Sequence, residues 1–147
     1  MTNGPMAIPA NDTTSPQARV RLTIKAMTPS NWIRICDLED IVPNTGVCAL
    51  VGKRQVAVVR VGDGTDVYAI SNFDPFSKAF VLSRGIVGDR QGVPKIASPI
   101  YKQNFDLRSG VCLDDPTVTV PTFPVRVVSR EGRIDVEIDA AITPEAE

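Results

Sequence analysis

The chain has 147 residues, of which 43% are hydrophobic and 22% charged, and its formal net charge is −1. This length suits one globular domain and is short for two. Without a basic surplus the sequence indicates no nucleic-acid partner. No apolar stretch approaches the roughly 18 residues that a membrane span requires, and no apolar segment follows a basic start as in a secretory signal peptide. We therefore expect a cytoplasmic protein that binds neither membranes nor nucleic acids.

Residues 1–30 differ from the rest of the chain, because they contain four prolines, many Ser, Thr and Asn residues, and no aromatic side chain. Such a segment buries too little apolar surface to offset the entropy lost on ordering, so we predict a flexible N-terminal extension. Within it, Arg19–Lys25 alternates in polarity and fits one short strand. A basic start poor in acidic residues also fits an organelle transit peptide, although the prolines and the lack of an amphipathic helical pattern make this the weaker interpretation.

Strand-forming residues dominate after residue 30, beginning with a run at Trp32, which we expect to lie in the core. Asp37–Ile41 then reads as one capped helical turn with Asp37 as its N-cap. Apolar runs bounded by Gly, Pro, Asn and Asp predict two hairpins, which turn across Gly52–Arg54 and at Glu131–Gly132. The further predicted strands are Val47–Val51, Gln55–Val61, Asp66–Ser71, Lys95–Ser98, Asn104–Leu107, Pro124–Ser129 and Arg133–Ile138.

Turn signals every eight to twelve residues, without a convincing long helix, indicate an all-β sandwich or small barrel. We assign this domain to residues 31–139 and expect residues 140–147 to form a short, frayed acidic tail. The regular pattern is broken between Ser71 and Lys95, where Asn72–Phe76 is too polar for a strand and Val81–Gly88 is irregular. Long loops on a β scaffold are frequent binding sites. The candidates for function are therefore the loops Asn72–Phe76 and Ser98–Gln103.

The chain has an odd number of cysteines, Cys36, Cys48 and Cys112, and no two of them form a C-x-x-C motif. A disulfide framework is therefore not expected, and a reducing compartment fits better. We predict that all three are small buried side chains. The alternative is one redox-active thiol, but the chain has no histidine to activate it.

The run Asn104–Gly110 reads N-F-D-L-R-S-G and resembles the F-D-L-x-[ST]-G motif that follows the second ligand loop of Rieske ferredoxins and oxygenases. In Rieske proteins a C-x-H loop and a C-x-x-H loop hold a two-iron cluster through two thiolates and two imidazoles. The corresponding positions of this chain are Asn72, Asp74, Ser98 and Tyr101. Because an amide, a carboxylate, a hydroxyl and a phenol do not supply those ligands, we expect a Rieske-like fold with a two-loop subdomain but no cluster.

With these replacements, the chain resembles one family in particular, the small subunits of assimilatory NAD(P)H-dependent nitrite reductases. The segments that carry the resemblance are Gly46–Leu50, Ala69–Phe76, Val81–Gly85, Ala97–Pro99 and Lys102–Phe105. The resemblance implies a large-subunit partner that carries sirohaem, a four-iron cluster and FAD and reduces nitrite to ammonium with NAD(P)H. It also implies that this chain holds no cofactor, contributes no catalytic residue, and supports the large subunit in nitrite and nitrate assimilation.

Five loop residues are candidates for contacting the partner: Phe73, Asp74, Phe76, Tyr101 and Lys102. Exposed aromatic rings at a loop tip are natural interface anchors, but both phenylalanines can equally fold back into the space that a cluster would occupy. Asp74 could bind a metal or relay protons, although a turn carboxylate that accepts backbone N–H bonds is the simpler interpretation. Tyr101 and Lys102 could attract an anion such as nitrite, or could simply be solvated.

Two other functions stay open from sequence alone. One is a metal-binding redox protein that uses Asp74 and a cysteine. The other is a free-standing Rieske-like binding module of another oxidoreductase.

Overall fold

The computed structural model describes residues 30–141. Residues 1–29, with the strand expected at Arg19–Lys25, and residues 142–147 of the expected acidic tail lie outside the described residues. Strands and short turns make up the described chain, which confirms the all-β prediction. No helix within residues 30–141 is long and apolar enough to cross a membrane.

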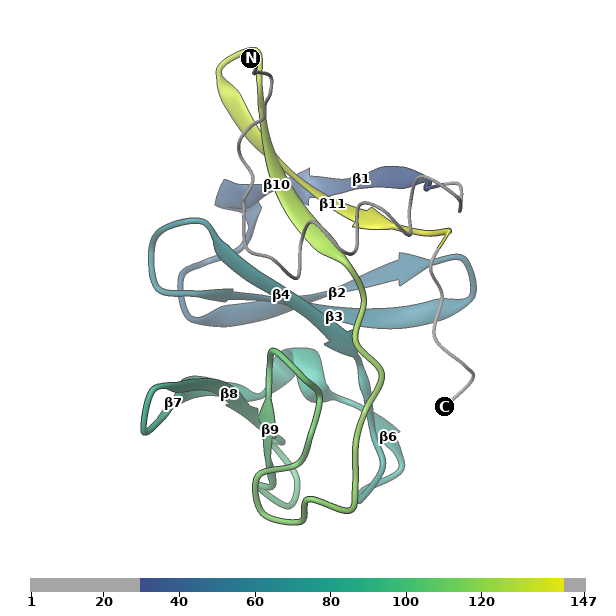
Figure 1. Cartoon of the computed structure of the whole chain (residues 1–147), viewed down its shortest axis with the longest axis vertical. Helices are drawn as coiled ribbons and strands as arrows, with labels where there is room; N and C mark the ends of the chain where they lie inside the picture. The colour runs from purple at the N-terminus through teal and green to yellow at the C-terminus, as the bar shows by residue number, and fades with distance from the viewer. Residues whose placement is uncertain (1–29, 142–147) are drawn as a thin grey trace, which may run out of the picture. The chain divides into compact units, whose positions relative to one another are not determined.

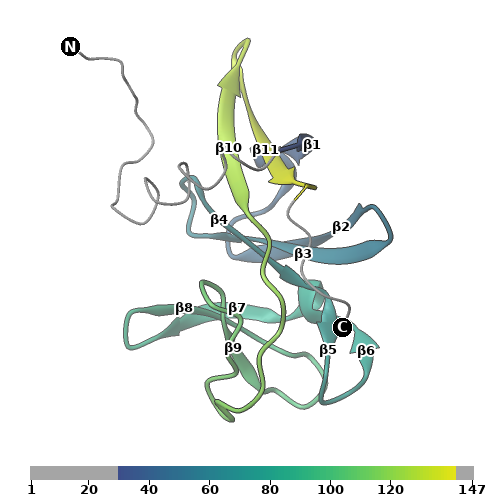
Figure 2. The same cartoon turned by 45° about the vertical axis from the view of Figure 1, so that its right-hand side comes forward.

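The strands between residues 30 and 141 form three antiparallel three-stranded sheets and one small hairpin. The first sheet has the order β1-β11-β10, made of β1 (Trp32–Asp37), β11 (Arg133–Asp139) and β10 (Val125–Arg130). The second is β2 (Thr45–Val51), β3 (Arg54–Val61) and β4 (Asp66–Ser71), and the third is β7 (Ile86–Arg90), β8 (Val93–Ala97) and β9 (Asn104–Asp106). Strands β5 (Phe73–Asp74) and β6 (Ala79–Phe80) pair in the hairpin. In Figures 1 and 2 the β2–β3–β4 sheet lies between the other two.

Strand β3 is buried on both faces and divides the interior into two cores. Its side chains alternate in direction, as in any strand. Val56 and Val58 therefore pack into a core shared with the β1–β11–β10 sheet, where they join Val136. Ala57 and Val59 point the other way and pack into a core shared with the β7–β8–β9 sheet. The lower sheet in Figure 1, which carries the loop between β8 and β9, is thus attached to the rest of the domain through the second core.

The predicted capped turn after β1 is confirmed as the short 3-10 helix η1 (Leu38–Asp40). The backbone N–H of Asp37 donates to Asp40 Oδ2 at 3.0 Å, and Leu38 is buried beneath the turn. The hairpin turn at Glu131–Gly132 is also found, with positive φ angles at both residues.

The N-F-D-L-R-S-G motif is a structural turn. Phe105 and Leu107 are buried in the second core. Between them, the Asp106 carboxylate accepts hydrogen bonds from the backbone N–H and the side chain of Arg108, at 2.8 and 3.3 Å. Gly110 has φ +81°, and a Cβ there would lie 2.1 Å from the carbonyl oxygen of Val120. The motif therefore requires glycine at this position, both for its backbone conformation and for the close approach of the backbone segment that contains Val120.

Two segments differ from the sequence prediction. Val81–Gly88, predicted to be irregular, contains the 3-10 helix η2 (Leu82–Arg84) and the first residues of β7. Strand β7 lies at a sheet edge with Ile86 exposed, so it lacks the apolar alternation of a half-buried strand. Asn72–Phe76, predicted as loop, contains β5, a strand too short to have a periodic signal.

Trp32 also departs from expectation, because it is only half-buried on β1. The guanidinium carbon of Arg126, on β10, lies 4.2 Å from its ring centroid. The ring is therefore covered by a cation on a partly solvated surface rather than enclosed in the core.

We predict that the second core is essential to stability. Ile70, fully buried on β4, and Ile86, exposed on β7, form a matched pair for truncation. Ile70→Ala should lower the free energy of unfolding in urea by about 2–5 kcal/mol, because it leaves a cavity. Ile86→Ala should change it by less than about 0.5 kcal/mol, as is usual for surface sites. Equal effects of the two substitutions would contradict a core that includes Ile70.

Candidate functional site

The candidate site consists of two loops that emerge from the lower part of the domain in Figure 1. We define the first loop as Asn72–Val81, which follows β4 and contains the β5–β6 hairpin, and the second loop as Ser98–Gln103, between β8 and β9. The four positions predicted to correspond to Rieske ligands all lie in these loops.

Asp74 and Ser98 join the two loops directly. Both side chains are fully buried, and the Ser98 hydroxyl donates a hydrogen bond of 2.5 Å to Asp74 Oδ2. The same oxygen accepts from the Ser77 hydroxyl at 2.8 Å, while Oδ1 accepts from the backbone N–H of Phe76 at 2.9 Å. Residues 24 positions apart in sequence are therefore cross-linked by a carboxylate with both oxygens satisfied.

The Asp74 carboxylate is held in its ionised form. Burial acts to raise the pKa of this group, but the hydrogen bonds from Ser98, Ser77 and the Phe76 backbone outweigh it and leave the pKa below its usual value. A carboxylate with a lowered pKa is a poor proton donor near neutral pH. The geometry therefore favours the interpretation of Asp74 as a turn and cross-linking residue.

Asn72 fixes the other end of the first loop. Its side-chain amide donates to Gln55 Oε1 at 3.1 Å and lies 3.5 Å from the Cys48 sulfur. Its Oδ1 accepts from the backbone N–H of Ser83 at 2.7 Å. Asn72 thus connects the β2–β3 hairpin to η2, and its donors and acceptor are occupied by the protein itself.

The second loop is closed by its own backbone. Ser98 N–H donates to the carbonyl of Gln103 at 2.9 Å, and Lys102 N–H donates to the carbonyl of Ser98 at 3.1 Å. The Ser98 hydroxyl also accepts from the N–H of Ile100 at 3.2 Å. Tyr101, the fourth ligand-equivalent position, projects into solvent and is 61% exposed.

The aromatic residues of the first loop divide into two groups. Phe76 turns inward, with its ring centroid 6.2 Å from that of buried Phe105. Phe73 packs against Phe80 with the ring centroids 5.1 Å apart and the rings tilted by 59°. The Phe80 side chain is 49% exposed. Sequence reasoning did not select Phe80. Its pairing with Phe73 across the two-residue strands β5 and β6 leaves no periodic pattern in the sequence, so only the structure identifies it.

The residues at the ligand-equivalent positions do not fit an iron–sulfur cluster. Thiolates and imidazoles are required, and Asp74 and Ser98 instead touch each other at hydrogen-bond distance. The nearest thiol, Cys48, approaches Asn72 from β2, and burial raises its pKa, which disfavours the thiolate. Within residues 30–141 there is also no group of three or more Cys, Asp or Glu side chains placed to hold a metal ion.

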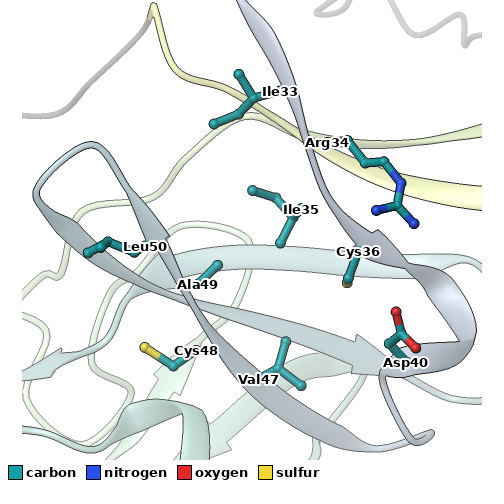
Figure 3. Close-up of a pocket in the computed structure, with 9 residues that line it drawn as sticks. All are labelled: Ile33, Arg34, Ile35, Cys36, Asp40, Val47, Cys48, Ala49 and Leu50. Atoms are coloured by element: carbon teal, nitrogen blue, oxygen red, sulfur yellow. The ribbon is translucent and has the colours of Figure 1, made fainter.

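A separate groove of about 370 Å³ lies between β1 and β2 (Figure 3). Figure 3 shows Ile33, Ile35 and Cys36 on one strand facing Val47 and Ala49 on the other. These apolar side chains belong to the first core or pack against it, so the groove is the open seam between two sheet edges.

The prediction of three buried cysteines was wrong for Cys48, which is exposed on β2, and Cys36 is only half-buried, whereas Cys112 is buried. Strand β2 is at a sheet edge, so its outward-facing positions meet solvent. Burial raises the pKa of both Cys36 and Cys48, so neither has the lowered pKa typical of a reactive thiol.

Known proteins similar to this chain have the same Rieske-like fold. Residues 31–137 match the family model of the "Rieske-like [2Fe-2S] domain". A "Nitrite reductase (NADH) small subunit" from Salmonella typhimurium is 48% identical over 98 residues, which cover 67% of this chain and 91% of that protein. The solution structure of a nitrite reductase [NAD(P)H] small subunit from Erwinia carotovora superposes with a TM-score of 0.63 at 44% identity, covering 78% of this chain and 84% of the other.

One relative has a different architecture. A "Nitrite reductase [NAD(P)H] large subunit" from Klebsiella oxytoca is 44% identical over 102 residues, which cover 69% of this chain but only 10% of that protein. A segment similar to this chain is therefore part of a much longer polypeptide in that organism.

We predict that removing the Asp74–Ser98 hydrogen bond destabilises the domain. Ser98→Ala and Asp74→Asn should each lower the free energy of unfolding at pH 7 by about 1–3 kcal/mol, because each leaves a buried polar group with one partner fewer. Urea titrations monitored by circular dichroism would measure this. Asp66→Asn, at an exposed strand end, is the matched control and should lie within about 0.5 kcal/mol of the unmodified chain.

The contribution of Asp74 should also depend on pH. Because its pKa is lower in the folded than in the unfolded chain, its stabilising effect is present above the unfolded value near 4 and is lost as pH falls through the folded pKa. The difference in unfolding free energy between the unmodified chain and Asp74→Asn should therefore shrink between pH 6 and pH 3. A difference that is constant over this range would contradict an ionised, hydrogen-bonded Asp74.

Purified full-length protein is expected to be colourless and iron-free, including after anaerobic incubation with iron and sulfide. Iron analysis and the visible absorption spectrum would measure this. A stoichiometric iron content with visible bands of a two-iron cluster would contradict the misfit of the ligand-equivalent positions.

Proposed function

The chain belongs to the family of nitrite reductase small subunits with a Rieske-like domain, and we propose that it is the small, non-catalytic subunit of an NAD(P)H-dependent nitrite reductase. The observation that carries the proposal is the 48% identity to the Salmonella typhimurium small subunit over 91% of that protein. In this role the chain supports the reduction of nitrite to ammonium by a large subunit in the cytoplasm. We assign sirohaem, a four-iron cluster, FAD and the NAD(P)H site to that large subunit.

The Klebsiella oxytoca relative supports a physical association. There, a segment similar to this chain makes up 10% of a polypeptide named as a large subunit. A domain that is covalently joined to its partner in one organism and encoded as a separate chain in another is expected to bind that partner through its own surface. Non-covalent binding to the large subunit is therefore the simplest role for a separate chain.

The site geometry supports a binding role over an electron-transfer role. An electron carrier needs a redox group, and the ligand-equivalent positions hold hydrogen bonds within the protein instead. The loops that would surround a cluster are retained and closed around Asp74. We propose that they serve as a shaped surface for the large subunit.

Within this surface we assign two kinds of role to the candidate residues. Tyr101 and Lys102 are exposed on the second loop and are proposed to contact the large subunit. Asp74 and Phe76 lie beneath the surface and are proposed to position the loops, with Phe73 supporting the exposed ring of Phe80.

The proposal predicts that nitrite reductase activity depends on this chain. Large subunit purified alone should oxidise NAD(P)H with nitrite more slowly than large subunit mixed with this chain, with a saturable increase as this chain is titrated in. Size-exclusion chromatography with light scattering should detect a complex of the two. The absence of a complex, together with full activity of the isolated large subunit, would overturn the proposed function.

A further inference from the structure

The exposed large hydrophobic residues within residues 30–141 are unevenly distributed. Four of the six belong to the two loops or border them, whereas the other two are Val42, between η1 and β2, and Leu50 on β2. The four are Phe80, Ile86, Ile100 and Tyr101, which are 49%, 62%, 44% and 61% exposed. Scattered exposed hydrophobics are ordinary, but a group at one end of a domain marks an interaction surface.

Ring contacts and hydrogen bonds join these four residues into one region. Phe80 stacks on Phe73, the neighbour of Asp74, and Asp74 is hydrogen-bonded to Ser98 of the second loop. Ser98 in turn accepts from the N–H of Ile100, which places Ile100 and Tyr101 on the same cross-link.

Ile86 is connected to the second loop through strand pairing. It is the first residue of β7 and pairs with Ala97, the residue that precedes Ser98. Each exposed apolar side chain is therefore linked to the Asp74–Ser98 hydrogen bond through neighbouring residues, a ring contact or a strand pairing.

The exposed charges of the two loops and η2 all have one sign. Lys78 in the first loop, Arg84 at the end of η2 and Lys102 in the second loop are exposed. Asp74 is the acidic residue of these segments, and it is fully buried. This local excess of positive charge contrasts with the chain's net charge of −1.

The region is also held in place without any cofactor. Asp74 fastens the first loop to the second, Asn72 fastens the first loop to β3 and η2, and backbone hydrogen bonds close the second loop. A preformed surface loses little conformational entropy on binding, which favours affinity.

From these observations we infer that Phe80, Ile86, Ile100 and Tyr101, bordered by Lys78, Arg84 and Lys102, form the docking face for an apolar patch edged by carboxylates on the large subunit. The inference rests on the proposed function and specifies its surface. An apolar centre with a charged rim is the usual anatomy of a specific interface, and rim charges steer the encounter of oppositely charged partners.

The groove between β1 and β2 is the competing surface, and Leu50, one of its lining residues, is 69% exposed. Its charged members, Arg34 and Asp40, differ in sign, and Arg34 is already bonded to Asp37 and Asp135. The groove therefore has no excess of one sign of charge that would favour a particular partner. This surface supplies the matched controls.

The test measures the dissociation constant between purified large subunit and full-length variants of this chain at low and moderate salt. Phe80→Ser and Tyr101→Ser should each weaken binding about tenfold or more, as truncated central anchors do. The double variant Lys78→Glu with Arg84→Glu should weaken binding most at low salt and flatten its salt dependence. The controls Leu50→Ser and Lys53→Glu, exposed on the β2–β3 hairpin outside the two loops, should bind like the unmodified chain.

Circular dichroism and urea unfolding of each variant would verify that it is folded, and all these substitutions are at exposed side chains. Unchanged affinity of the loop variants, or loss of affinity in Leu50→Ser alone, would overturn the docking face and leave the proposed function intact. Tighter binding after charge reversal would overturn the carboxylate-edged partner. If the unmodified chain neither binds the large subunit nor changes its activity, the proposed function is overturned and this inference with it.

Discussion

Burial of β3 on both faces is the constraint on which the rest of the structure depends. Val56 and Val58 serve one core, and Ala57 and Val59 the other, so a shift of one residue in register would exchange the two sets. The register with β2 and β4 is therefore fixed by packing on both sides. Because β4 continues directly into Asn72, that register also sets where the first loop begins. The position of the first loop thus depends on how β3 packs in the two cores.

In the predicted correspondence with Rieske proteins, a buried carboxylate occupies a position that would hold a cluster ligand. A cluster ties two loops together by covalent coordination, whereas Asp74 does so through hydrogen bonds from Ser98, Ser77 and the Phe76 backbone. Such a buried charge is stable only when its acceptors are satisfied, and here both oxygens are. The two loops are therefore held together by the chain's own side chains, and the fold by itself does not imply redox chemistry.

Much of the fold could be predicted because its signals are local. The β2–β3 and β10–β11 hairpins have turn residues between apolar runs, and the replaced ligand positions identify the two loops. Features decided by tertiary packing could not be predicted. Phe76 and Phe80 are the same residue type in the same loop, yet Phe76 packs on Phe105 and Phe80 is exposed to solvent. Likewise, Cys48 is exposed because β2 ends a sheet, and sheet order is invisible in a single sequence. The loops were therefore accessible to sequence reasoning, whereas the contacting side chains required the structure.

The distribution of charge separates the docking face from the opposite end of the domain. On the β1–β11–β10 sheet, Asp135 and Glu137 are buried beneath Arg34, Arg126, Arg130 and Arg133, and these ion pairs hold the pKa of both acids below its usual value. Most of the positive charge there is matched by carboxylates within hydrogen-bond distance. The cations around the two loops have no such match, since Asp74 accepts its hydrogen bonds from hydroxyl and backbone groups. A partner edged with carboxylates therefore gains most by approaching the loops, which gives an almost neutral chain a preferred orientation in the encounter.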